Sequence, residues 1–226
     1  MAGVHMMLMS ASPASVSAQA EPLVVEPVWL QRGASSGNVR NFAGVSLGSA
    51  SPSRDMYLVM FSRTNTTTGS RRFTGASITV DGVPYAMEMV VEASSVAVAS
   101  PCAVWHVAVP TGETGDVTIN ISGDTQGVVH EHYQLYRVAG DFEFVSATYA
   151  EDSTVSTVAE TGGVAVHGVY SAGTTMTTGD YTVQDDTYNG GVLAVLAGRV
   201  FPTVSPVATV SASTGNRSMI FSFGQR

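Results

Sequence analysis

The chain has 226 residues, of which 44% are hydrophobic and 12% charged, and its formal net charge is −8. This composition is typical of a folded domain and excludes a disordered chain. The acidic balance argues against nucleic acid as a partner, because phosphate binding needs clustered Lys or Arg. No apolar run approaches the roughly 18 residues of a membrane-spanning helix, so no membrane contact is expected.

Every basic residue other than histidine is arginine, and Val, Thr, Ser, Ala and Gly dominate from end to end. Long soluble helices usually carry Lys and Glu on their exposed face. The β-branched residues of this chain favour strands instead, and Gly, Pro and Asx interrupt them. We therefore predict an all-β protein, an antiparallel β-sandwich of the jelly-roll or immunoglobulin-like type.

Residues 1–22 are rich in Met, Ala and Ser and follow no consistent period. Their short apolar run has no Lys or Arg before it, as a secretory signal would require. We expect residues 1–22 to form an extended N-terminal arm that packs on a neighbouring molecule or on its own domain, and we favour the neighbour. The candidate contact residues in this arm are Met6, Met7, Leu8 and Met9.

From residue 23 onward the pattern predicts one strand after another, with a new one about every eight to sixteen residues. An almost continuous apolar run at residues 56–63 indicates a strand that is covered on both faces. Asp81-Gly82 predicts a hairpin between residues 77–80 and residues 85–91. The other predicted strands are 23–25, 28–30, 40–47, 102–109, 117–121, 128–138, 142–149, 154–158, 163–170, 174–183, 192–200, 207–211 and 217–223. Strand density is even along the chain, so residues 23–226 are expected to form one sandwich domain.

The pair His130 and His132 is the most suggestive cluster for a metal. On a strand, both side chains lie on one face about 6.6 Å apart, which suits Zn²⁺. Glu131 points to the other face, and no third ligand is evident. A polar, exposed strand face predicts the same residues, and we favour that interpretation. No metal and no cofactor are therefore expected.

An acidic stretch with Asp180, Asp185 and Asp186 is predicted to be a loop. Calcium binds several oxygen ligands on such loops, but ordinary acidic turns have the same composition. Tyr181 and Tyr188 flank this stretch, and we expect them at the surface, where they could stack on a sugar or contact a protein.

Other residues are expected to have structural roles. Cys102, the one cysteine, should be buried at the start of a strand, and Trp105 should lie in the core. Arg71-Arg72 should lie in a solvated loop. No strand-to-helix nucleophile elbow is evident, and a few carboxylates are candidates for catalysis by residue type alone. We therefore expect no enzyme. Those carboxylates are Glu88, Glu92, Glu143 and Glu151.

The pattern of predicted strands and turns in residues 23–226 resembles that of β-sandwich accessory virion proteins of tailed bacteriophages. This class includes decoration, collar and tail-associated proteins. The resemblance rests on stretches such as residues 56–60, 77–83 and 217–223. It carries over no functional residue. It implies a virion protein that forms homo-oligomers and joins other virion proteins through its N-terminal arm and its sheet edges.

The sequence thus predicts a non-enzymatic structural protein that decorates a phage capsid or belongs to the tail or collar. The alternative is a carbohydrate- or receptor-binding β-sandwich module with a host surface glycan as its partner. Its site would lie in loops such as residues 180–191, which include Tyr181 and Tyr188, or residues 64–72. Under the first hypothesis, removal of residues 2–22 abolishes assembly and leaves the sandwich folded.

Overall fold

The computed structural model describes residues 21–33, 37–64, 71–93, 101–123, 128–150, 154–156, 164–171, 182–188, 192–200, 207–209 and 217–226. These residues form antiparallel strands and contain no helix, so the predicted all-β class is confirmed. In this part of the chain there is consequently no helix that could span a membrane.

Sheets A and B contain the first nine strands. Sheet A has the strand order β1-β9-β3-β7-β6, and sheet B has the order β2-β8-β4-β5. The strands of sheet A are β1 (Val24–Gly33), β3 (Asp55–Thr64), β6 (Glu88–Ala93), β7 (Cys102–Ala108) and β9 (Val128–Ala139). Those of sheet B are β2 (Val39–Ser46), β4 (Arg72–Val80), β5 (Val83–Ala86) and β8 (Thr114–Ser122).

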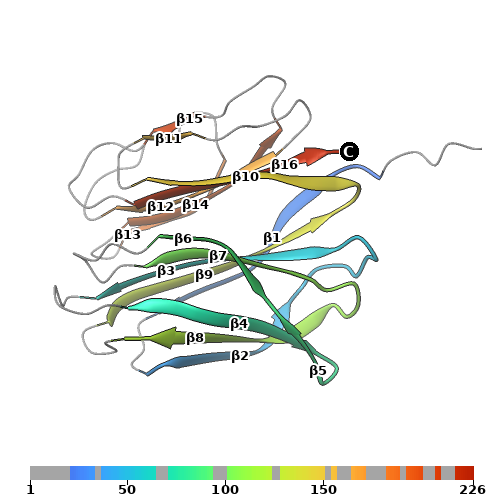
Figure 1. Cartoon of the computed structure of the whole chain (residues 1–226), viewed down its shortest axis with the longest axis horizontal. Helices are drawn as coiled ribbons and strands as arrows, with labels where there is room; N and C mark the ends of the chain where they lie inside the picture. Colours follow the sequence, from blue (N-terminus) through green and yellow to red (C-terminus); the bar gives the residue numbers. More distant parts are fainter. Residues whose placement is uncertain are drawn as a thin grey trace, which may run out of the picture.

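Sheet C is formed by strands between residues 142 and 225, in the order β10-β16-β12-β14-β13. Its strands are β10 (Phe142–Ala150), β12 (Val164–Ser171), β13 (Thr182–Tyr188), β14 (Val192–Val200) and β16 (Arg217–Gln225). A separate pair consists of β11 (Thr154–Ser156) and β15 (Val207–Thr209). Figure 1 shows sheet A in the middle of the molecule, between sheet B and sheet C.

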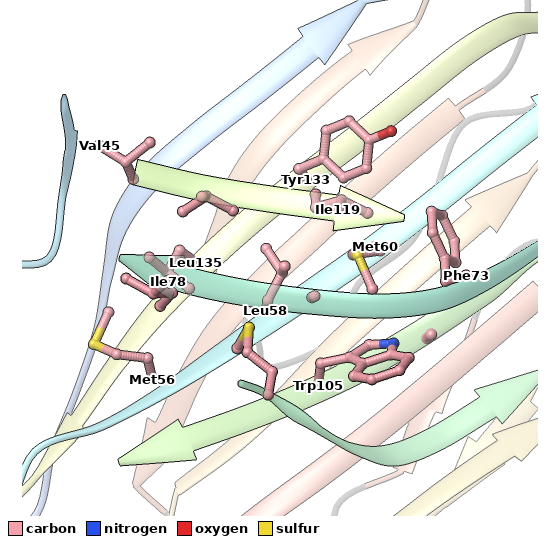
Figure 2. Close-up of a cluster of buried hydrophobic side chains, with 14 of the residues drawn as sticks. Val45, Met56, Leu58, Met60, Phe73, Ile78, Trp105, Ile119, Tyr133 and Leu135 are labelled. Carbon is pink, nitrogen blue, oxygen red and sulfur yellow. The ribbon is translucent and has the colours of Figure 1, made fainter. Parts of the chain in front are cut away.

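The larger core lies between sheets A and B (Figure 2). Leu58 and Met60 of β3 contribute to it from sheet A, and Ile78 and Ile119 contribute from sheet B. Trp105 of β7 belongs to this cluster, which confirms its prediction as a core residue. Period-2 alternation within each strand produces this core, because every second side chain faces the opposite sheet.

A second core lies between sheets A and C. Tyr57 and Val59 of β3 and Tyr136 of β9 pack there with Phe223 of β16. The Phe223 ring meets the Tyr57 ring edge to face, with 4.8 Å between the ring centroids. Strand β3 is therefore buried on both faces, as its continuous apolar run predicted.

The hairpin at Asp81-Gly82 is confirmed, and both residues have positive φ angles of 51° and 79°. The strand predicted at residues 85–91 is wrong, because it consists of two strands in different sheets. Strand β5 ends at Ala86 in sheet B, and β6 begins at Glu88 in sheet A. Between them the Met87 amide donates to the Ala76 carbonyl (2.9 Å), and its buried side chain enters the core, so the chain crosses over at this residue.

The strand pairs of sheets A and B are nested in the sequence. Strand β1 pairs with β9, β2 with β8, β3 with β7, and β4 with β5. The chain thus resembles one long hairpin whose two arms are folded over into two sheets, with β6 as an additional strand on the edge of sheet A.

Phe223→Ala tests the packing of sheet C on sheet A. We expect the free energy of unfolding to fall by about 3–5 kcal/mol, because the substitution leaves a cavity beside Tyr57. Urea denaturation followed by circular dichroism measures this change.

The matched control is Phe144→Ala, at a residue of the same aromatic group that is 39% exposed. Its effect should be about 1 kcal/mol or less, because little area is lost from the core. Equal losses for the two variants would contradict the packing of Phe223 between the sheets.

Candidate functional site

Three charged side chains are buried together between sheets A and B. Glu131 of β9 accepts two hydrogen bonds from Arg40 of β2, each 2.6 Å long, from Nε to Oε2 and from Nη2 to Oε1. Arg71, just before β4, donates from Nη2 to Oε1 of the same carboxylate. This bidentate, charge-assisted geometry is the strong form of an ion pair. We call these three residues the arginine–glutamate triad.

The charges of the triad shift the pKa values of Arg40 itself and of the neighbouring Tyr133. The hydrogen bond from Arg40 to Glu131 raises the pKa of Arg40 in spite of its burial. Burial raises the pKa of the Tyr133 hydroxyl, and the Glu131 charge raises it further, so Tyr133 stays neutral. Arg40 Nη1 also donates to the carbonyls of Gly37 (3.0 Å) and Val39 (3.2 Å), which fixes the chain at the start of β2.

The triad corrects one prediction about this region. Arg71 was expected in a solvated loop, but it is buried with only 2% of its surface exposed. The physical reason is Glu131, whose position on an apolar strand face requires cations from the opposite sheet. No motif in the sequence marks the pairing, because 91 residues separate Arg40 from Glu131.

A third buried guanidinium, that of Arg54, lies at the opposite end of the sandwich. Arg54 donates from Nε to the Val109 carbonyl and from Nη2 to the Thr111 carbonyl, both at 2.6 Å. Its Nη1 reaches the carbonyls of Gly48 (3.1 Å) and Leu47 (3.4 Å). Burial lowers the pKa of Arg54, and these four carbonyls replace its hydration. Both arrangements join segments of sheets A and B through buried charged side chains.

The face of β9 that carries His132 is buried, which also differs from the prediction. We expected a polar, exposed face, but His132, Gln134 and Tyr136 are all buried. Sheet C covers this face, and the sequence of β9 alone does not reveal that cover. Burial lowers the pKa of His132 to about 3, and the Arg32 charge contributes. Glu131 faces sheet B, as predicted from strand alternation.

Metal ligands are not grouped in the part of the chain that the structure describes, where no three His, Cys, Asp or Glu side chains are close enough to hold an ion. The side chain of His130 lies outside the described residues. His106 Nε2 lies 3.1 Å from Asp55 Oδ2 on the face of sheet A toward sheet C. Cys102 is buried at the start of β7, as predicted.

The predicted acidic loop is in part a strand. Asp185 and Asp186 belong to β13, where they pair with Val195 and Ala194 of β14, so the loop prediction is wrong at these positions. Residues 182–188 begin with Thr-Val and end with Thr-Tyr, and this β-forming content allows an edge strand in spite of the two Asp residues. Asp180 lies outside the described residues.

The predicted partner-binding residues are mostly outside the described part of the chain. Met6, Met7, Leu8, Met9 and Tyr181 all lie there. Tyr188 is the last residue of β13, an edge strand of sheet C, and only its backbone is described. These six assignments stay predictions.

Three of the four carboxylates that were candidates by residue type lie among the described residues, on two different sheets. Glu88 and Glu92 lie on β6 of sheet A, whereas Glu143 lies on β10 of sheet C. Glu151 lies outside the described residues.

Exposed apolar side chains have a regular distribution that the sequence did not indicate. Among the described residues, every large hydrophobic side chain that is exposed belongs to an edge strand. The most exposed are Val83 of β5 (54%), Val39 of β2 (51%) and Met89 of β6 (50%). The remaining ones are Val24 and Leu30 of β1 and Phe144 of β10.

The same edge strands are irregular along their hydrogen-bonded ladders. The register shifts once in each of β1, β2, β6, β10 and β13, and β5 has four residues including Pro84. Bulges and prolines twist an edge and interrupt its row of donors and acceptors, which discourages the addition of another strand. These edges therefore expose apolar side chains beside an irregular backbone ladder.

No protein-family model matches this chain, and no curated protein matches it. The class that the described residues define is an antiparallel all-β protein with packed sheets.

Glu131→Gln tests the arginine–glutamate triad. We expect the free energy of unfolding to fall by about 3–5 kcal/mol, because two buried guanidinium groups lose their counter-charge. Urea denaturation at neutral pH measures the loss.

Glu26→Gln is the matched control, since Glu26 Oε1 accepts from Arg137 Nη1 at 3.1 Å but is 45% exposed. Its effect should stay within about 1 kcal/mol. A similarly small effect for Glu131→Gln would contradict the role of the triad.

His132→Gln tests the burial of the neutral imidazole. The pKa of His132 is about 3 in the folded chain against a usual value of 6.5, so the unfolded chain binds the proton more readily. The contribution of His132 to the free energy of unfolding is greatest above pH 6.5 and decreases as the pH falls toward 3. Between pH 8 and pH 5, protonation of this residue alone should lower the free energy of unfolding of the wild type by about 2 kcal/mol.

Urea denaturation at the two pH values measures this effect as the difference between the two proteins. The variant should lose less stability than the wild type by that amount. Parallel pH profiles would show that His132 is not buried in the neutral form.

Proposed function

We propose that this chain is a non-enzymatic structural protein of a phage virion, which decorates the capsid or forms part of the tail or collar. It would form homo-oligomers and contact other virion proteins through its N-terminal arm and its sheet edges. The observation that carries the proposal is the confinement of exposed large hydrophobics to edge strands among the described residues. Apolar surface concentrated at such borders is suited to contacts with neighbouring subunits.

We further propose that strands β1–β9 form a jelly roll. Its support is the nested pairing of β1 with β9, β2 with β8, β3 with β7, and β4 with β5. Jelly rolls are two-sheet barrels common in viral capsid and lectin domains. A jelly roll would therefore support a virion protein. Because lectin domains share this fold, it would also support the glycan-binding alternative.

The irregular edges indicate how neighbours would meet. A flat, regular edge joins another chain by adding a strand, and this leads to open-ended growth. Bulges in β1, β2, β6 and β10 interrupt that route. Contacts in a closed oligomer would then depend on side chains such as Met89 and Val83.

The N-terminal arm is suited to a neighbour by its composition. Residues 1–20 contain no Asp, Glu, Lys or Arg. The arm residues Met6, Met7, Leu8 and Met9 are flexible apolar side chains that adapt to an irregular surface. Such an arm would contribute contact area without a buried charge.

Met89→Lys tests the edge contacts. We expect association between copies to weaken about tenfold or more, because a charge at a buried interface anchor costs more than 1.4 kcal/mol. Light scattering over a range of concentrations measures the native mass.

The matched control is Asn120→Lys, which places the same charge on an exposed position of β8, an inner strand of sheet B. This control should keep the mass of the wild type. An unchanged mass for Met89→Lys, or a monomeric wild type, would contradict docking through the edges.

A further inference from the structure

Three buried polar atoms of sheet A have no hydrogen-bond partner among the described residues. They are Ser62 Oγ of β3, Glu92 Oε1 of β6 and Trp105 Nε1 of β7. Only 3% of Ser62 and 8% of Trp105 is exposed. A polar atom that loses its hydration on folding and gains no partner destabilises the fold. Native proteins therefore satisfy such atoms with protein groups or with a bound polar molecule.

The strand register gathers these three side chains around Ala103 of β7. Ala103 is opposite Glu92 of β6 on one side and opposite Met60 of β3 on the other. Trp105 is two residues farther along β7, and Ser62 is two residues beyond Met60, so all of them lie on one face of the sheet. Side chains directly opposite each other are about 5 Å apart, and those two positions along a strand are about 6.6 Å apart. Ser62, Glu92 and Trp105 are therefore neighbours around one small side chain.

This face of sheet A is the covered one that packs on sheet B. Met60, Ala103 and Trp105 all belong to the core between the two sheets. Figure 2 shows the nitrogen of the Trp105 indole on the edge of the ring that faces Met60. Since the side chain of Ala103 is a single methyl group, it fills less of the layer above the strand than its neighbours do. The polar atoms thus surround the smallest side chain of this part of the core.

The three atoms together match the hydrogen-bonding capacity of one hydroxyl group. The Trp105 N–H only donates, a carboxylate such as that of Glu92 accepts, and the Ser62 hydroxyl does either. A water or alcohol oxygen that accepts from Trp105 and donates to Glu92 has a lone pair left for Ser62. Two to four polar partners of this kind are what a buried water molecule needs. A cation is unsuited, because the indole N–H directs a proton toward it.

We propose that β3, β6 and β7 form a binding site for one hydroxyl group, that of a water molecule or of a small polyol, which bridges Ser62, Glu92 and Trp105. The bridge fastens β6, an edge strand whose backbone pairs only with β7, to β3 on the far side of β7. This inference goes beyond the proposed function, because it concerns residues of a single chain and does not depend on a neighbouring subunit.

A double-mutant cycle tests the bridge. Ser62→Ala and Glu92→Met each remove one partner of the hydroxyl group and keep most of the packing. We expect Ser62→Ala to lower the urea midpoint and to raise the unfolding equilibrium constant about fivefold. Because both residues act through one shared molecule, the double variant should lose less stability than the two single losses together, by about twofold or more in the equilibrium constant.

Glu88→Met is the matched control, since Glu88 lies on the same strand but is exposed. Its effect should add to that of Ser62→Ala without coupling. Additive effects of Ser62→Ala and Glu92→Met would overturn the proposal. A higher urea midpoint for Ser62→Ala would also overturn it, because removal of an unsatisfied hydroxyl group is stabilising.

The indole N–H resonances in nuclear magnetic resonance spectra identify the bridging molecule. The chain has two tryptophans, and the partly buried Trp29 of β1 is the internal control. If water forms the bridge, the Trp105 indole proton should show cross-relaxation with a long-lived water molecule, and Trp29 should not. If a polyol forms it, added glycerol should shift the Trp105 resonance saturably and leave Trp29 unchanged. The absence of both effects at Trp105 would show that no hydroxyl group is bound.

Discussion

The carboxylate of Glu131 between the guanidinium groups of Arg40 and Arg71 is the interaction on which the sandwich depends. It joins β9 of sheet A to β2 of sheet B and to Arg71, the residue just before β4. Arg54 acts at the other end through four backbone carbonyls. Arg40 and Arg54 each donate four hydrogen bonds, which exceeds the three donors of a lysine ammonium. The use of arginine in place of lysine therefore has a physical reason at these buried sites.

The position of sheet A explains the distribution of polar and apolar residues. Both of its faces are covered, so side chains such as His132 and Gln134 are buried although their pattern is polar. Among the side chains that the structure describes, the large exposed apolar ones lie on edge strands, as Met89 and Val83 do.

Alternation and turn residues predicted the all-β class, the β4–β5 hairpin and the two-sided burial of β3, because these features depend on neighbours in the sequence. Strand partners could not be predicted, because period 2 specifies a face and not the neighbouring strand. For the same reason Arg71 was placed in solvent, since its partner Glu131 is 60 residues away. A signal was present nonetheless: Glu131 alternates with Tyr133 and Leu135 on an apolar face, and a charge there requires a buried counter-ion.

The nested strand pairing has a consequence for synthesis on the ribosome. Arg40 and Arg71 leave the ribosome long before Glu131, and β1 waits for β9, its only partner in sheet A. Loops of this length are slow to close, and fold topologies rich in such pairings fold slowly. Sheet B can pair before β9 is made, because β2, β4, β5 and β8 all precede it, but β1 has no partner in sheet A until then. During that interval unpaired strands and uncompensated arginines are exposed, which makes nascent chains on one messenger prone to pair with each other.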